Sequence, residues 1–317
     1  MAHSSPPAVS VLMPLFNGEK YLELAIQSVL EQSYEDFEFI LMDDSSDDRS
    51  IEIAGQFTDP RLILYREDTR LGIFGNSNRA ARKARGNYIK YVYQDDVLLP
   101  HCLNILVKAM IEFPQTGIAS SPRMVIDNKG VVQRVAGLKE EAGVIPGDKA
   151  LKLIAAHGNY IGEPTSALLK KEHFFDAGGF DERFFYMGDI HLWSRLLVNH
   201  DLYYHPVPLC KFRYHVDQKS EEYKQDIDLL EREERWFRED FRVWALQRNM
   251  TRYEQRKAEI QLGAQFLRRI WAKIKDRSVR LPKATTLAFS GLKFMLLMQS
   301  LLFLIITRIR RKRNFLM

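Results

Sequence analysis

Two carboxylates, Asp95 and Asp96, follow the apolar run at 88–93, where a predicted strand ends. Hard divalent cations such as Mg²⁺ and Mn²⁺ prefer carboxylate oxygens and keep several waters, so one or two carboxylates at a strand end can hold one. A cation held there could neutralise the charge that develops on a leaving phosphate group. Asp96 could equally cap the next helix, because Asp is a favoured N-cap residue. We therefore expect Asp95 to be the principal metal ligand, with Asp96 as a second candidate.

A second acidic cluster, Asp43-Asp44-Ser45-Ser46-Asp47-Asp48, follows the apolar run at 37–42. One explanation is an acidic turn in which Ser46 or Asp47 caps the next helix. Carboxylates at a buried strand end are costly, however, unless they meet a donor group or a ligand. We therefore expect Asp43 and Asp44 to recognise the base or ribose of a bound nucleotide.

Two further side chains could take part in proton transfer or metal binding. Asp189 stands at the start of an amphipathic helical pattern, where it could be a general base or only a helix cap. His215, in the segment Arg213-Tyr-His-Val-Asp217, could complete a metal shell or touch a phosphate. A lone histidine is more often structural, so a structural role of His215 stays open beside the ligand role.

The elements that would position these residues alternate along the first part of the chain. Apolar runs at 9–15, 37–42, 62–65 and 88–93 predict strands, and helical patterns lie between them. Gly86 is expected to end the third helix as its C′ residue. This alternation predicts an α/β fold with a mostly parallel sheet and helices on both faces. Ligands bind such sheets at the carboxyl ends of the strands, so both acidic clusters should face one crevice.

Composition narrows the class of protein. The 317 residues are 46% hydrophobic, and 46 basic against 41 acidic side chains give a formal charge of +5. This mild excess suits an anionic ligand or a membrane surface, and no aromatic-basic motif accompanies it, so we expect no nucleic-acid partner. Cys102 and Cys210 form neither a disulfide framework nor a zinc motif, and no secretory signal is recognised. A cytoplasmic location is therefore expected.

Three segments differ in composition, and we expect them to be separate units. Residues 1–218 would form the α/β domain, with the loop-rich segment 118–180 facing an acceptor. Residues 219–276 would form a charged helical extension, whose aromatic residues at helical spacing are expected to pack. They are Trp236, Phe237, Phe241 and Trp244. Residues 277–317 would form an apolar and basic helix.

The segment 281–306 is strongly apolar and is followed by the basic run 308–313. Its uninterrupted part, 294–306, is shorter than the roughly 20 residues that a spanning helix needs. An interfacial helix with a polybasic flank fits, since such flanks attract anionic lipids. A tilted span and a helix docked on the protein itself remain alternatives. We expect peripheral association with the cytoplasmic face of a membrane.

Together these motifs resemble the family 2 glycosyltransferases, whose catalytic domain has the GT-A nucleotide-diphosphosugar transferase fold. The resemblance covers about residues 8–217. It rests on Val9-Ser-Val-Leu-Met-Pro-Leu-Phe-Asn17, on Asp43-Asp44-Ser-Ser-Asp47, on Asn78 with Ala84-Arg-Gly-Asn-Tyr-Ile-Lys-Tyr91, and on Gly178-Gly-Phe-Asp-Glu182 with Gly188-Asp189 and Leu192-Trp-Ser-Arg-Leu196. Four motifs in the family's order and spacing make the resemblance specific.

The resemblance implies roles for individual positions. Nucleotide contacts would come from Pro14, Phe16, Asp43 and Asp44, metal and diphosphate contact from Asp95, and base catalysis from Asp189. The usual Asp-x-Asp metal motif reads Tyr93-Gln94-Asp95 here, so Gln94 or Asp96 would substitute for the missing carboxylate. The common Glu-Asp pair of the acceptor motif is Gly188-Asp189, which keeps the Asp.

The expected activity is inverting transfer of a sugar from a nucleotide-sugar donor to an acceptor hydroxyl, with Mg²⁺ or Mn²⁺ as the cofactor. The basic C-terminus suggests a glycan or lipid-linked acceptor and a role in cell-envelope polysaccharide or glycolipid synthesis. The alternative is a non-catalytic GT-A scaffold in a membrane-associated glycan-assembly complex, which the missing first metal carboxylate would favour.

Overall fold

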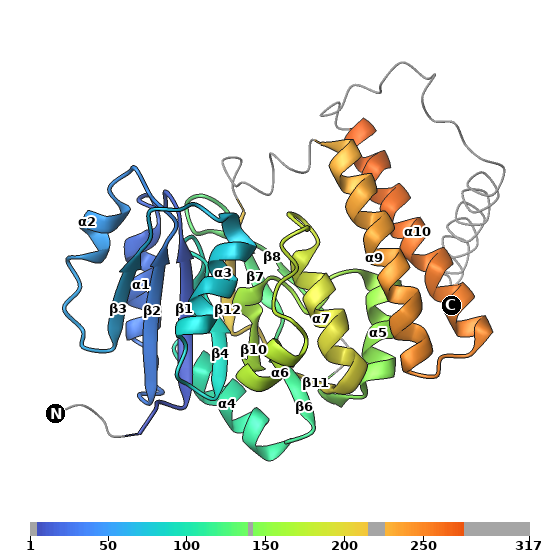
Figure 1. Ribbon diagram of the computed structural model, residues 1–317, viewed down its shortest axis with the longest axis horizontal. Coiled ribbons are helices and arrows are strands. Elements are labelled where there is room, and N and C mark those ends of the chain that lie inside the picture. The colour runs from blue at the N-terminus through green and yellow to red at the C-terminus, as the bar shows by residue number, and fades with distance from the viewer. Residues whose placement is uncertain (1–4, 139–141, 215–225, 276–317) are drawn as a thin grey trace.

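The computed structural model describes residues 5–138, 142–214 and 226–275 (Figure 1). The strands are β1 Val9–Leu15, β2 Phe37–Asp43, β3 Leu62–Arg66, β4 Tyr88–Tyr91, β5 Val97–Leu98, β6 Thr116–Ser120, β7 Arg123–Ile126, β8 Val132–Ala136, β9 Gly143–Ile145, β10 Ala167–Lys170, β11 Asp201–Tyr204 and β12 Cys210–Arg213. The helices are α1 Leu22–Leu30, α2 Ser50–Ala54, α3 Gly72–Lys83, α4 Cys102–Glu112, α5 Gly147–His157, α6 Lys171–Asp176, α7 Gly188–Asn199, α9 Ile227–Gln247 and α10 Arg252–Lys275, with a 3-10 turn η1 at Pro164–Ser166.

The main sheet has eight strands in the order β3-β2-β1-β4-β10-β6-β11-β9. The first four are parallel to one another, as the alternating strands and helices predict. β10 pairs antiparallel with both β4 and β6. β2 and β4 lie on either side of β1, so the strand order reverses there and a crevice is expected at its carboxyl end. A second sheet has the order β5-β12-β7-β8.

Helices cover both faces of the main sheet, and each face has its own apolar core. Alternate residues of β1 point to opposite faces, as in any strand. Val9, Val11 and Met13 pack with side chains of α1 and α4, whereas Leu12 packs with side chains of α3, α5 and α7. This three-layer arrangement is the α/β fold, with a mostly parallel sheet and helices on both faces, that the sequence predicts.

The helices α9 and α10 form a hairpin that lies against α7 and α5 (Figure 1). The predicted aromatic stripe is part of the main core, because Phe237, Phe241 and Trp244 are buried together with Trp193 of α7. The predicted segment 219–276 therefore shares a continuous core with the α/β domain along its described part.

The prediction that Gly86 ends the third helix was wrong, because α3 stops at Lys83. A Cβ atom at Gly86 would lie 2.6 Å from the backbone nitrogen of Ser10, so glycine is needed there for close approach to β1.

Among the described residues, no helix is both long and apolar enough to cross a membrane. The predicted helix at 277–317 lies outside the described residues.

Candidate functional site

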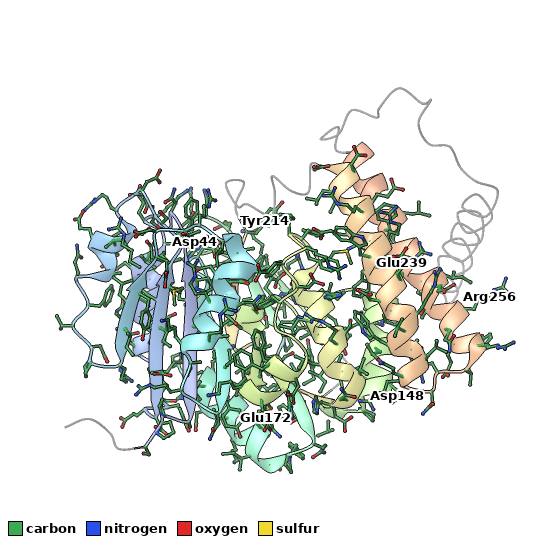
Figure 2. The ribbon with its side chains drawn as sticks, viewed as in Figure 1. Asp44, Asp148, Glu172, Tyr214, Glu239 and Arg256 are labelled. Carbon is green, nitrogen blue, oxygen red and sulfur yellow. The ribbon has the colours of Figure 1, made fainter. Side chains whose placement is uncertain are left out.

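Polar side chains from several strands meet at the carboxyl end of β1. Asp43 ends β2 and Asp44 follows it, while Asp95 and Asp96 follow β4 on the other side. Figure 2 places Asp44 and Tyr214, which follows β12, along the same edge of the molecule. This strand order puts both acidic clusters at the carboxyl edge of the main sheet, on either side of β1.

The acidic loop after β2 holds the loop after β1. Ser46 Oγ accepts a hydrogen bond from the backbone N–H of Asn17, at 3.0 Å, and Ser50 Oγ accepts one from Gly18, at 2.8 Å. Asp48 accepts a further one from the N–H of Glu19. Part of the acidic run is therefore structural, as the turn interpretation expected, and its function is to fix the backbone beside Phe16.

Asp43 and Asp44 are both buried, and their partners differ. Asp43 accepts the backbone N–H of Ser46 with long distances of 3.2 and 3.3 Å. The two oxygens of Asp44 accept the backbone N–H groups of Leu71 and Gly72, each at 2.8 Å. Asp44 therefore fixes the start of α3 and the segment that carries Arg70.

An aromatic ring and a cation face each other just beyond the end of β1. The guanidinium of the exposed Arg70 lies 3.6 Å from the ring centroid of Phe16, a cation–π contact. The side-chain amide of Gln94 pairs with both backbone groups of Phe16, donating to its carbonyl and accepting its N–H at 2.8 Å. Gln94 thus uses its amide to place Phe16.

Asp95 and Asp96 have different environments. Asp96 is fully buried, and its carboxylate accepts hydrogen bonds from Thr165 Oγ1, at 2.5 Å, and from the backbone N–H of Arg213, at 3.0 Å. Burial, with the adjacent charge of Asp95, raises the pKa of Asp96 well above its ordinary value. Asp95 is partly exposed beside it. The outward carboxylate at this strand end is therefore that of Asp95.

The hydroxyl of Tyr93 is buried. Burial is the main cause that raises the pKa of this hydroxyl, and the negative charges of Asp189, Asp96 and Asp95 raise it further. Charges act this strongly only over short distances in a protein. Asp189, which lies almost a hundred residues further along the chain, therefore acts on the same hydroxyl as the Asp95–Asp96 pair.

Asp189 lies in the first turn of α7, where its half-buried carboxylate has two donors. Asn159 Nδ2 donates to Oδ2, and the backbone N–H of Ile190 donates to Oδ1, both at 2.7 Å. Burial first, and the charge of Glu163 second, raise the pKa of Asp189 to about 7. A carboxyl group with this pKa exchanges its proton near neutral pH, as a general base must.

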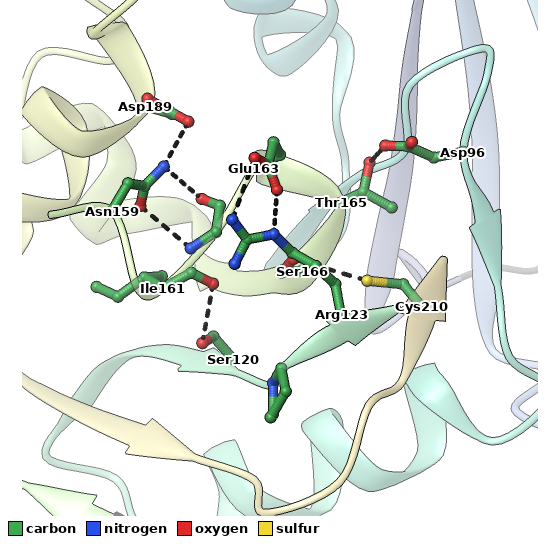
Figure 3. Close-up of polar contacts among 12 residues, drawn as sticks. Asp96, Ser120, Arg123, Asn159, Ile161, Glu163, Thr165, Ser166, Asp189 and Cys210 are labelled. Atoms are coloured by element: carbon green, nitrogen blue, oxygen red, sulfur yellow. Dashed lines mark hydrogen bonds and ion pairs between the residues drawn. The ribbon is translucent and has the colours of Figure 1, made fainter. Parts of the chain in front are cut away.

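The segment 159–165 connects the two carboxylate sites, as Figure 3 shows. Asn159 binds Asp189 at one end, and Thr165 binds Asp96 at the other. Between them Glu163 forms an ion pair with the buried Arg123 of β7. One short segment therefore fixes the spacing of the two sites.

With this geometry in place, comparison with known proteins decides the family. The model of glycosyl transferase family 2 matches residues 10–174, which is more than half of the chain. The chain belongs to glycosyl transferase family 2. An uncharacterized protein of Mycobacterium tuberculosis (strain CDC 1551 / Oshkosh) is 32% identical over 66% of this chain and 67% of its own length. The chain spans from 38% to 67% of the first three curated relatives that it matches.

Two solved structures have the same fold. Staphylococcus aureus TarS, crystallised with UDP-GlcNAc, gives a TM-score of 0.61 at 17% identity, over 83% of this chain and 72% of that one. The Pyrobaculum calidifontis mannosyltransferase PcManGT, in complex with GDP-Man and Mn²⁺, gives 0.57 at 18% identity, over 94% and 85%. These likenesses confirm the GT-A fold for this family 2 glycosyltransferase.

The structure gives a physical reason for one departure from the family 2 pattern, at Gly188. A Cβ atom at Gly188 would lie 2.3 Å from the ring of Phe74. That ring is buried and stacks on Phe180 with centroids 4.9 Å apart. The space that a glutamate side chain would need at position 188 is therefore filled by an aromatic pair.

The residues at the end of β4 suit a hard cation with few protein ligands. Among residues 5–138, 142–214 and 226–275, no group of three or more His, Cys, Asp or Glu side chains could hold a metal. Mg²⁺ and Mn²⁺ need only one or two carboxylates when phosphates and waters complete the shell, so Asp95 fits. His215, the third predicted ligand, lies outside the described residues.

Several residues of the family 2 site have no signal in the sequence. Asn159 bonds Asp189, and Glu163 pairs with Arg123, through contacts between distant segments, and none of the three belongs to a motif. Arg70 follows an unremarkable polar loop. Pro14 lies in β1, one residue before that strand ends. Motif spacing identifies the acidic groups but not the partners that orient them.

Proposed function

We propose that the chain transfers a sugar from a nucleoside diphosphate donor to an acceptor hydroxyl, by single displacement with inversion at the anomeric carbon. The observation that carries this proposal is that the segment 159–165 bonds Asp189 through Asn159 and Asp96, the neighbour of Asp95, through Thr165. It brings a carboxyl group that titrates near neutral pH close to an outward carboxylate suited to a divalent cation.

The nucleoside would bind between β1 and β2. Phe16, held by Gln94 and covered by Arg70, offers an aromatic and cationic surface to a base and diphosphate. Asp43, whose present hydrogen bonds are long, would accept a donor group of the base or ribose. Asp44 would act indirectly, by holding the backbone at Leu71 and Gly72. Pro14 would lie beside the bound nucleotide. The two similar structures, which contain UDP-GlcNAc and GDP-Man, support a donor of this class.

Asp95 would hold a Mg²⁺ or Mn²⁺ ion together with the diphosphate oxygens, and Asp96 would support it from the buried side. When bound, such a cation stabilises the negative charge of the departing nucleoside diphosphate. The Mn²⁺ ion in the complex of the similar mannosyltransferase supports this choice of cofactor.

Asp189 would accept the proton of the acceptor hydroxyl. The acceptor oxygen then attacks the anomeric carbon, a new glycosidic bond forms, and the bond to the diphosphate oxygen breaks. Asn159 would hold the Asp189 carboxylate at a fixed angle during this step. A positioned base of this kind typically contributes about 10²–10⁴-fold to the rate.

A non-catalytic scaffold is the second candidate. Tyr93 occupies the position of the family's first metal carboxylate, which favours this alternative. The environment of Asp189 favours the enzyme, because a carboxylate with two hydrogen-bond donors and a raised pKa has no evident purpose in a scaffold. We therefore propose the transferase as the main function.

The acceptor would be a glycan or a lipid-linked molecule at the cytoplasmic face of a membrane, within cell-envelope polysaccharide or glycolipid synthesis. The apolar and basic segment 281–313 supports this location. A chain shortened after residue 276 should bind vesicles of anionic lipid much less tightly than the full chain. Equal binding of both forms would overturn the membrane proposal and leave the transferase proposal intact.

The donor is tested by a thermal-shift screen of UDP-, GDP- and dTDP-sugars, each with and without Mn²⁺ or Mg²⁺. We expect one nucleotide series to raise the unfolding temperature in a metal-dependent way, and Asp95→Ala to remove that dependence. Asp148→Asn is the control, because Asp148 is a partly exposed residue, paired with Lys152, at the opposite edge of the molecule (Figure 2). No shift with any donor would favour the scaffold.

A further inference from the structure

The segment that leads into α7 is held by a carboxylate from the C-terminal helices. Glu233 of α9 is completely buried, and its two oxygens accept the backbone N–H groups of three consecutive residues. The distances are 2.6 Å from Phe185, 3.1 Å from Tyr186 and 2.9 Å from Met187. A buried carboxylate without such donors would be strongly unfavourable, so these bonds explain why Glu233 can be buried there.

These three residues directly precede the helix that carries Asp189. α7 begins at Gly188, and Met187, its N-cap residue, makes no side-chain capping hydrogen bond. A chain that leads into a helix is usually fixed by such a local cap. Here Glu233 fixes the start of the helix from a distance of 46 residues along the chain.

The same face of α9 also contacts α7 further along. Asp240 lies seven residues after Glu233 and shares a hydrogen bond with His191 Nε2 at 2.9 Å. Phe237, which lies between them on this face, is buried and packs near the His191 ring. α9 therefore contacts both the segment before α7 and its first turn, which together flank Asp189.

We propose that Glu233 is a positioning residue for Asp189, and that the α9–α10 hairpin is a working part of the transfer site. This inference rests on the proposed role of Asp189 as the base. The backbone N–H groups of 185–187 are held by Glu233, so the start of α7 has one position relative to Asn159 and the acceptor. Without that restraint the carboxylate of Asp189 would sample orientations that do not receive the acceptor proton.

The test is Glu233→Gln, which keeps the shape of the side chain but replaces one accepting oxygen by an amide nitrogen. We expect kcat to fall about 10- to 100-fold, because small misplacements of a reacting group have effects of this size. The affinity for the donor nucleotide, measured with the metal present, should stay within twofold, since the nucleotide residues lie on other elements. Backbone amide exchange at residues 185–187 should become faster.

The pH dependence of kcat distinguishes a positioning role of Glu233 from a loss of stability, because a loss of stability alone would not shift it. A looser start of α7 admits water to Asp189, which lowers its pKa toward that of an ordinary carboxyl group. The acid limb of the kcat profile should therefore move to lower pH in Glu233→Gln. The charged groups that act on Asp189, which are Glu163 and Arg123, are unchanged in this variant.

Glu234→Gln is the matched control. Glu234 is the next residue of α9 and is also buried, but it forms an ion pair with Arg269 of α10 at 2.6 Å. Its substitution should weaken this one contact between α9 and α10 without changing the pH profile or amide exchange at 185–187. An equal loss of kcat with the same profile shift in both variants would overturn the proposal.

Two outcomes separate this inference from the proposed function. If Asp189→Asn abolishes transfer while Glu233→Gln has the kcat and pH profile of the unsubstituted protein, only the inference about Glu233 is overturned. If Asp189→Asn retains full transfer, the proposed base itself is wrong, and the role of Glu233 is wrong with it.

Discussion

Asn159 donates a hydrogen bond of 2.7 Å to the carboxylate of Asp189, from a segment that lies 30 residues earlier in the chain. Asn159 is itself held by Gly162, whose backbone N–H and carbonyl both bond the Asn159 amide at 3.1 Å. The amide can therefore present only its nitrogen to Asp189. This relationship orients the carboxylate and favours its charged form.

Replacing that donor should change how Asp189 titrates. Asn159→Asp keeps the acceptor for the N–H of Gly162 but places a second carboxyl group against Asp189. Two carboxylates in contact raise the pKa of one of them strongly. Because the base must be deprotonated, the acid limb of the kcat/KM profile should move upward from about pH 7, by at least about one unit. An unchanged acid limb would show that Asp189 is not the group that titrates.

The crowding at Gly188 predicts a loss of stability on substitution. Gly188→Ala brings a methyl group against the Phe74 ring, and overpacking of this kind costs about 1–3 kcal/mol in the free energy of unfolding. Urea unfolding measures the change, and the double variant with Phe74→Leu should recover most of it. Gly55→Ala, where the nearest neighbour would be 3.3 Å away, is the control and should have a small effect. Equal effects of the two alanine variants would contradict the packing argument.

A pair of stacked histidines predicts how stability depends on pH. The rings of His173 and His200 lie face to face, with centroids 3.6 Å apart. Burial, followed by the charges of His173 and Lys170, lowers the pKa of His200 to about 4. The unfolded chain therefore takes up a proton near pH 6.5, before the folded protein does, and stability should fall as the pH falls from 6.5 to 4. His200→Asn should flatten this dependence in urea unfolding at about pH 7.5 and pH 5, and an equal slope in both proteins would contradict the assignment.

The sequence predicts the sheet well because its strands are buried on both faces. The apolar runs at 9–15 and 37–42 match β1 and β2 to within one residue, since a continuous apolar run is typical of a central parallel strand. β4 ends at Tyr91, two residues before the apolar run at 88–93 does, although the backbone N–H of Val92 still bonds the carbonyl of Leu12 in β1. Gly86 was predicted to end a helix but instead allows close packing against β1. Both situations favour glycine, so the residue type alone does not distinguish them.

The site is only partly predictable for a different reason. Asp43, Asp95 and Asp189 follow strands or start a helix, and those positions can be recognised from local pattern. Their partners Asn159 and Glu233 lie in segments with no such pattern, and only the tertiary fold brings them close. Contacts over long sequence separations leave no periodic trace in a single sequence.

The role of Asp189 as the base of the transfer reaction is tested by measuring sugar transfer in Asp189→Asn. Transfer to acceptor should fall by about 10²–10⁴-fold, while metal-dependent binding of the donor should stay within about twofold, because asparagine keeps the shape of the side chain but cannot take the proton. Asp148→Asn, which alters another carboxylate in the first turn of a helix, should transfer at the normal rate. Full transfer activity in Asp189→Asn would contradict the proposed mechanism.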